Sequence, residues 1–203
     1  MKEPLGEHDI IPLVIDLILR PLLSSGERRL RWPEINTDER TCRTKRVQRP
    51  DSVLNDIDSL AFGCSRLFGE VKPDAATDRL NAIDLLRLSR FAKDAIDFSR
   101  AKQIITFQAV GPLITFYLST LIGDGTYTMA ELHTIELPAC IKEISKIIEN
   151  INRFYDIYLR LETMTLIDSD FWEHNHRETN DTPFMDKIMD KSQRKRFCMV
   201  HFN

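Results

Sequence analysis

Apolar side chains recur along this chain with two different periods. A spacing of three and four residues places them on one face of a helix, whereas strict alternation places them on one face of a strand. The helical spacing extends over residues 7–26, 77–103 and 139–164. Two runs rich in β-branched and aromatic residues, 113–122 and 126–137, flank a Gly-Asp-Gly turn signal. The pattern therefore predicts three helices and one β-hairpin.

Shorter apolar runs predict further strands in the first half of the chain. Residues 29–35 form a short strand or an arm, and residues 49–54 and 67–72 form two strands joined by a polar connection. Residues 104–110 are expected to belong to a second helical segment after the helix over 77–103. The resulting order of helix, three strands, helix, two strands and helix is typical of an α/β (α+β) fold with one central mixed sheet flanked by helices.

Length and composition indicate one ordinary domain followed by a tail. The chain has 203 residues, of which 42% are hydrophobic and 29% are charged, as in globular proteins. We expect residues 1–165 to form the domain and residues 166–203, where the periodicity fades, to form a polar, poorly ordered tail. No secretion signal is recognised, and no apolar run reaches the roughly 20 residues of a membrane span. We therefore expect an intracellular protein, cytoplasmic or nuclear, with no membrane partner.

The stretch FGEVKP, residues 68–73, combines an acid and a base on one predicted strand. Because successive side chains of a strand point to opposite faces, Glu70 and Lys72 share one face. The opposite face then receives Leu67, Gly69 and Val71. This arrangement on a half-buried strand is explained either by an ion pair on a surface strand or by a functional site.

Asp51 begins the preceding predicted strand and joins this pair if the two strands are neighbours. Two carboxylates are suitable ligands for Mg²⁺, and the backbone carbonyl of Val71, between Glu70 and Lys72, is a further candidate ligand. A bound metal ion activates a water molecule and neutralises charge on a phosphate, and a lysine beside it stabilises the transition state. One interpretation of the three side chains is therefore phosphodiester hydrolysis, and the other is a structural ion pair.

The motif RPD, followed by GEVKP and then by a helix and strands, resembles the PD-(D/E)XK restriction-endonuclease-like nuclease superfamily. The core of that superfamily is an αβββαβ arrangement with the acids and the lysine on the second and third strands. The resemblance implies that Asp51, Glu70 and Lys72 are catalytic and that Asp51 and Glu70 bind Mg²⁺ or Mn²⁺. It also implies a carboxylate ligand on the first helix, for which Glu7 is the best placed and Asp9 the next.

Two further implications concern the second half of the chain. Some branches of the superfamily add a catalytic glutamine on the following helix, a part that the resemblance assigns to Gln108 or, less well, to Gln103. The segments GEVKP, FQAVGPLITFYLSTLIGDGTYTMAEL and IELP also resemble a large group of uncharacterised proteins of early-diverging (zygomycete) fungi, over roughly residues 5–165. That second likeness implies the same layout and no established activity.

Nucleic acid, either DNA or RNA, is the partner that the nuclease resemblance implies. The formal net charge is −3, so phosphate contacts must come from local basic clusters. The cluster that precedes the motif supplies Arg43, Lys45, Arg46 and Arg49. The alternative is a catalytically inactive α/β module of the same fold that binds protein or nucleic acid, with Glu70 and Lys72 merely paired; a helix-mediated interaction protein comes third.

Other polar residues are weaker candidates for a functional site. His174 and His176 are two residues apart and lack further predicted ligands, so we expect them to be free rather than metal-bound. Glu131 and His133 share a face of a predicted strand and are expected to form a polar surface. The four cysteines contain no C-x-x-C pair, which argues against a structural zinc site.

Overall fold

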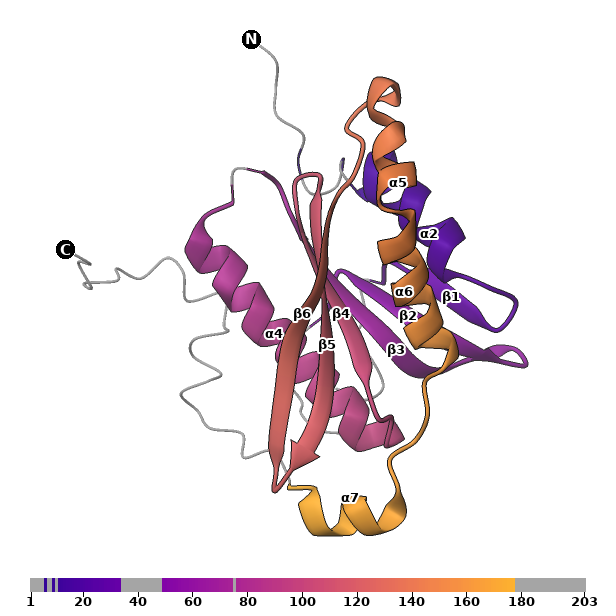
Figure 1. Cartoon of the computed structure of the whole chain (residues 1–203), viewed down its shortest axis with the longest axis vertical. Helices are drawn as coiled ribbons and strands as arrows, with labels where there is room; N and C mark the ends of the chain where they lie inside the picture. Colours follow the sequence, from indigo (N-terminus) through magenta and orange to yellow (C-terminus); the bar gives the residue numbers. More distant parts are fainter. Residues whose placement is uncertain (1–5, 7–8, 10, 34–48, 75, 178–203) are drawn as a thin grey trace, which may run out of the picture.

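The computed structural model describes residues 6, 9, 11–33, 49–74 and 76–177 of the chain (Figure 1). Within this part, one six-stranded mixed sheet forms the centre of the protein, with the strands in sequence order. Neighbouring strands are antiparallel except β3 and β4, which are parallel. The strands are β1 (Arg28–Arg31), β2 (Ser52–Asp58), β3 (Ala61–Lys72), β4 (Ile104–Val110), β5 (Leu113–Gly123) and β6 (Thr126–Glu136).

Helices cover both faces of this sheet, which confirms the predicted α+β arrangement. A π-helical turn η1 (Ile11–Ile15) leads into α2 (Asp16–Leu23), and α4 (Asp78–Ser99) connects the parallel strands β3 and β4. The helical segments after the sheet are the 3₁₀ turn η2 (Ile141–Glu143), α5 (Ser145–Glu149), α6 (Ile151–Glu162) and α7 (Ser169–Asn175). None of the described helices is long and apolar enough to cross a membrane.

Two apolar cores lie on the two faces of the sheet. Leu19 of α2 and Ile157 of α6 pack with Leu67 and Phe107 in the first core. In the second core, Phe91 of α4 packs with the opposite sheet face, and Trp172 of α7 belongs to the same group. Figure 1 shows the resulting three layers, with α4 on one side of the sheet and α2 and α6 on the other.

Strand β3 distributes its side chains as the sequence predicts. Leu67 and Val71 belong to the core beneath α2 and α6, whereas Phe68 belongs to the core beneath α4. Glu70 and Lys72 alternate with Val71 and therefore point to the α4 side, where Glu70 contacts Arg87 of that helix. The predicted partition of this strand is confirmed.

The connection between β2 and β3 differs from the sequence-based expectation. The two strands continue far beyond residues 49–54 and 67–72 and are joined by a tight turn at Ser59 and Leu60, in which Ser59 has a φ of 56°. The outer part of this hairpin has little apolar alternation because it lies away from the cores and is held by backbone pairing. Its polar sequence therefore resembles a loop.

Residues 104–110, expected to be helical, form strand β4. The first six positions of this strand are all buried, so no alternation of apolar and polar residues identifies it. A strand covered on both faces appears in sequence as a continuous apolar run, which periodicity alone does not separate from a buried helix. Gln108 consequently lies on a strand and not on a helix.

The predicted helix over residues 139–164 is present but divided. Asn150 separates α5 from α6, and its side-chain amide donates to the carbonyl of Lys146 at 2.8 Å. The polar side chain thus satisfies a backbone acceptor at the break.

Part of the expected tail is also folded. Helix α7 is capped by Asp168, whose side chain accepts from the backbone N–H groups of Asp170 and Phe171, and it buries Trp172. A single large aromatic residue anchors this short polar helix, so the expectation of poor order is wrong for residues 166–177. Residues 178–203 lie outside the described residues.

Candidate functional site

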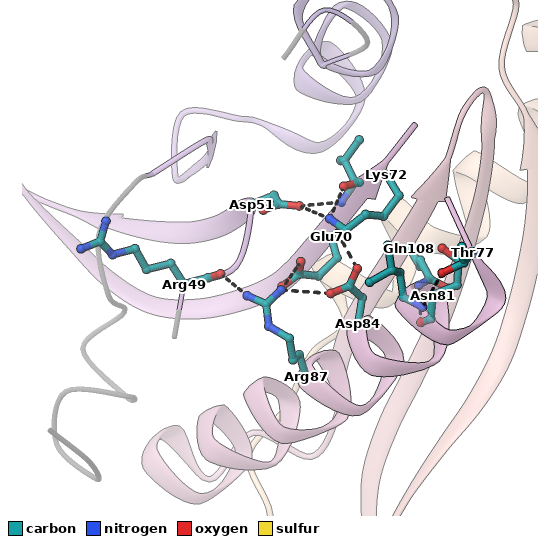
Figure 2. A network of polar contacts seen from close by, with 11 residues as sticks. Arg49, Asp51, Glu70, Lys72, Thr77, Asn81, Asp84, Arg87 and Gln108 are labelled. Carbon is teal, nitrogen blue, oxygen red and sulfur yellow. Dashed lines mark hydrogen bonds and ion pairs between the residues drawn. The ribbon is translucent and has the colours of Figure 1, made fainter. Parts of the chain in front are cut away.

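Five charged side chains meet where β2 begins, where β3 ends and on the buried face of α4 (Figure 2). We call them the charged cluster: Asp51, Glu70, Lys72, Asp84 and Arg87. The sequence predicts the first three members and their convergence. Asp84 and Arg87 come from α4, which packs over the end of β3.

Asp51 is fixed by the backbone of β3 before β2 begins. Its N–H donates to the carbonyl of Gly69 at 3.0 Å, and its Oδ2 accepts from the N–H of Val71 at 2.7 Å. The carboxylate therefore extends the β2–β3 ladder and takes the place of a backbone acceptor. This pairing holds Asp51 directly beside the segment that carries Glu70 and Lys72.

Lys72 lies between two of the carboxylates. Its Nζ is 3.4 Å from Oδ2 of Asp84 and 3.7 Å from Oδ2 of Asp51, and it donates to the carbonyl of Val71 at 2.5 Å. The side chain is only 7% exposed. A lysine ammonium is costly to bury without acceptors, and these carboxylate and carbonyl oxygens provide them.

Arg87 joins the remaining acids to the start of β2. One guanidinium nitrogen, Nη1, donates to Oε2 of Glu70 at 2.7 Å and to Oδ1 of Asp84 at 3.0 Å. The other, Nη2, donates to the backbone carbonyl of Arg49 at 2.6 Å. Burial acts to lower the pKa of Arg87, but the negative charges of Glu70, Asp84 and Asp51 outweigh it, so the pKa is raised and the group remains a cation.

The cluster is deeply buried for so many charges. The side chains of Glu70 and Asp84 have no exposed surface, and that of Arg87 is 6% exposed. Removing charges from water costs several kcal/mol per ion, a cost that is offset only by close partners with good geometry. A buried network of this kind is therefore a poor way to stabilise a fold, whereas buried charges beside charged partners are typical of functional sites.

The donor atoms partly fit a divalent cation. Asp51, Glu70 and Asp84 offer hard carboxylate oxygens of the type that Mg²⁺ and Mn²⁺ accept. However, Glu70 and Asp84 accept from Arg87, and the carbonyl of Val71 accepts from Lys72. Among the described residues, no group of three or more histidine, cysteine, aspartate or glutamate side chains is arranged to hold a metal ion. Metal uptake therefore requires Arg87 to move away from Glu70.

Gln108 lies next to the charged cluster on the neighbouring strand. It pairs in register with Glu70 across the parallel strands β3 and β4. Its Nε2 donates to the backbone carbonyl of Asn81 in α4 at 2.7 Å, so the amide links the sheet to the helix. Gln103 lies elsewhere, and its amide donates to the carbonyl of Arg160 at 2.9 Å.

The remaining predicted site residues are Glu7, Asp9, Arg43, Lys45, Arg46 and Arg49. Glu7, Arg43, Lys45 and Arg46 lie outside the described residues. Asp9 accepts from the N–H of Gly6 at 3.1 Å. Arg49 contributes its backbone carbonyl to Arg87, while its side chain points away from the cluster in Figure 2.

The histidines in the described part of the chain make contacts outside the charged cluster. His176 stacks on Trp172 with ring centroids 4.3 Å apart, and His174 contacts the carbonyl of Asp170. His133 contacts Asp156 of α6 at 2.9 Å, so its side chain links β6 to that helix.

Asp84 and Arg87 were missed by the sequence analysis, although a signal for them exists. The buried face of α4 includes Asp84, Leu88, Phe91 and Ala95, which follow one another at helical spacing. A charged residue inside an apolar stripe is unusual and favours a buried polar contact. The sequence does not reveal which strand supplies the partner.

The order α2, β1, β2, β3, α4, β4 places Asp51 at the entry to the second strand and Glu70 and Lys72 on the third. The arrangement of these elements alone does not define a family, because one fold can carry many functions. Comparison of the chain with protein-family models, with curated proteins and with solved structures finds no match.

Proposed function

We propose that the charged cluster is the hydrolytic centre of a metal-dependent, nuclease-like domain of the PD-(D/E)XK type. The observation that carries the proposal is the convergence of Asp51, Glu70 and Lys72, from two adjacent strands, into one buried network. Glu70 and Lys72 lie 19 and 21 positions after Asp51 in the sequence, and the pairing of β2 with β3 brings their strand beside it. This proximity supports the proposal.

The proposed division of labour follows from the types of the side chains. Asp51 and Glu70 are the candidate ligands of Mg²⁺ or Mn²⁺, which supplies an activated water and neutralises phosphate charge when bound. Lys72, held beside Asp51 and Asp84, presents a positive charge to the phosphate as it becomes more negative. Gln108 joins the strand that carries the site to α4 and acts as a positioning residue. Hydrolysis adds water across one P–O bond and yields a phosphate monoester and an alcohol.

Cleavage of nucleic acid tests the proposal. Plasmid DNA, single-stranded DNA and RNA are incubated with the wild-type protein in Mg²⁺, in Mn²⁺ and in EDTA. We expect metal-dependent cleavage that Glu70→Gln reduces by about 100-fold or more, because a reacting-centre carboxylate is removed. Glu149→Gln, an exposed acid on α5, serves as the control and should cleave like the wild type.

Two results would count against hydrolysis. One is the absence of cleavage under all conditions, and the other is equal cleavage by the wild type and Glu70→Gln, which indicates a contaminating nuclease. Circular dichroism of both proteins establishes that the comparison is made between folded molecules.

A second function, a non-catalytic α/β binding module, is favoured by one specific observation. Arg87 pairs with both Glu70 and Asp84, which neutralises the acids that a metal site needs. In this case the charged cluster fastens α4 to the sheet, and binding of protein or nucleic acid takes place elsewhere. Nucleic-acid binding that persists in Glu70→Gln without any cleavage by the wild type would support this second function.

A further inference from the structure

Within the charged cluster, Arg87 contacts the acids in the way that a bound cation would. A single nitrogen, Nη1, lies 2.7 Å from a Glu70 oxygen and 3.0 Å from an Asp84 oxygen. A positive centre that bridges carboxylates from two different elements is also what a divalent ion provides. Figure 2 shows the guanidinium between β3 and α4, with Glu70 and Asp84 directed toward it.

The guanidinium and a metal ion cannot share these oxygens. Mg²⁺ needs carboxylate oxygens at about 2.0–2.1 Å in an octahedral shell, most of which is filled by water. A guanidinium in hydrogen-bond contact with Glu70 takes the space of that shell and adds like charge beside it. Occupancy by Arg87 and occupancy by a divalent ion at Glu70 are therefore alternatives.

Arg87 also contacts the segment that precedes Asp51, the other candidate ligand. Its Nη2 donates to the carbonyl of Arg49, two residues before Asp51, so one side chain touches the segments that carry both candidate metal ligands. Movement of Arg87 away from Glu70 releases the acid of β3 and alters the support of the segment that leads to Asp51. The position of Arg87 therefore affects both Glu70 and the segment that carries Asp51.

We propose that Arg87 is an internal competitor of the divalent metal, holding Glu70 and Asp84 until a metal ion displaces it. The proposal rests on the proposed function, because it assigns a regulator to the same metal site. When an internal cation holds the site, the apparent affinity for metal equals the intrinsic affinity multiplied by the fraction of molecules in which the site is open. Removal of the competitor increases that fraction.

Calorimetric titration of Mn²⁺ into the full chain tests the competition without any activity measurement. We compare the wild type, Arg87→Gln and Arg79→Gln; the last replaces an exposed arginine in the first turn of the same helix. If the arginine-bound state is at least about tenfold more populated than the open state, Arg87→Gln should bind Mn²⁺ with a Kd at least about tenfold lower than that of the wild type. Arg79→Gln should bind as the wild type does.

Thermal unfolding gives a second readout. Arg87→Gln removes the guanidinium that pairs with the buried carboxylates of Glu70 and Asp84, so its Tm without metal should fall. Because a ligand that binds the folded state stabilises it, saturating Mn²⁺ should raise the Tm of Arg87→Gln more than that of the wild type. Adding Glu70→Gln to Arg87→Gln should abolish this gain.

The outcomes separate the two proposals. If the wild type binds Mn²⁺ and Arg87→Gln binds with equal or weaker affinity, the competition is overturned while the metal site stands. If neither protein binds Mn²⁺, both proposals are overturned. If Arg87→Gln does not fold even with Mn²⁺, Arg87→Lys is titrated, because lysine is shorter and has one nitrogen in place of the two that contact Glu70, Asp84 and Arg49. Tighter Mn²⁺ binding than the wild type supports the competition, whereas equal or weaker binding overturns it.

Discussion

Gly69, directly before Glu70, has no space around it for a larger side chain. A Cβ added at this position would lie 2.1 Å from Cζ of Phe107 and 2.4 Å from Oγ of Ser52. Both neighbours are buried, in β4 and β2 respectively, so neither has room to move away. The glycine lets three strands pack closely one residue before Glu70.

We predict that Gly69→Ala lowers the free energy of unfolding by about 1–3 kcal/mol through overpacking. Gly63→Ala on the same strand is the matched control, because an added Cβ there meets no atom closer than 3.4 Å. That control should change stability by no more than about 1 kcal/mol, with stabilisation favoured. Urea unfolding of both variants measures the difference, and similar stability of the two proteins would contradict the packing argument.

Asp156 provides a pH-dependent contact between α6 and β6. Its Oδ2 lies 2.9 Å from Nε2 of His133 and from Nε of Arg160. Burial raises the pKa of Asp156, but the hydrogen bonds from Arg160 and His133 outweigh that effect, so the pKa is lowered. The carboxylate therefore stabilises the fold above its unfolded-state pKa of about 3.9, and this stabilisation is lost as the pH falls through the lower folded-state value.

We predict that Asp156→Asn is less stable than the wild type at pH 7 and that the difference shrinks between about pH 4 and pH 2, below the unfolded-state pKa. The urea midpoints of both proteins across this range measure the effect. Glu173→Gln, an exposed carboxylate on α7, is the comparison. A stability gap that stays constant down to pH 2 would show that the carboxylate charge is not responsible.

At this scale the sequence predicts the motif residues better than their partners. Alternation alone assigns Glu70 and Lys72 to one face of β3, because strand geometry allows no other result. The partners Asp84 and Arg87 depend on how α4 crosses the sheet, which local sequence does not specify. The sequence pattern thus identifies candidate catalytic residues, whereas tertiary packing decides which charged side chains pair with them.

At the scale of elements, Trp172 provides the main apolar contact of α7. This side chain is 8% exposed and packs in the core beneath α4. Backbone bonds from Lys102 to Thr165 and from Ile167 to Arg100 fix the chain just before the helix. A seven-residue helix has little stability of its own, so α7 depends on this docking.

We predict that Trp172→Ala lowers the free energy of unfolding by about 2–4 kcal/mol and exposes α7 to proteolysis, because a large aromatic contact is lost. Phe171→Ala is the control, since that neighbour is 39% exposed. Limited proteolysis and urea unfolding measure the two effects. If Phe171→Ala is equally damaging, the orientation assigned to α7 is wrong.

The elements differ in how far the sequence specifies them. The Gly-Asp-Gly turn and its flanking strands are confirmed, since Asp124 and Gly125 take the positive φ values that a tight hairpin turn needs. Strand β4 was predicted wrongly because its burial on both faces removes the period-two signal. This central strand is therefore the one that local pattern identifies least well.

At the scale of the whole molecule, the parallel pair β3 and β4 determines where the site lies. A parallel pair needs a crossover connection, and α4 provides it, passing across the face to which Glu70 and Lys72 point. The same helix contacts the segment before Asp51, because Arg87 donates to the carbonyl of Arg49. One helix thus supplies both the cover of the charged cluster and the cation that occupies it.

The account as a whole depends on whether these buried charges perform chemistry or only fasten α4 to the sheet. Lys72→Met distinguishes the two roles, because methionine keeps much of the apolar length of lysine and removes the ammonium. The carboxylates that are the candidate metal ligands stay in place in this variant. A structural cluster has no reaction to lose, whereas a catalytic cluster loses the charge that faces the phosphate.

The initial rate of Mn²⁺-dependent cleavage of a labelled oligonucleotide by the wild type and Lys72→Met is the most direct measurement. The account predicts cleavage by the wild type and a rate lower by about 100-fold or more in Lys72→Met, with Mn²⁺ still bound to the folded variant. Cleavage at the same rate by both proteins, or by neither, would contradict it.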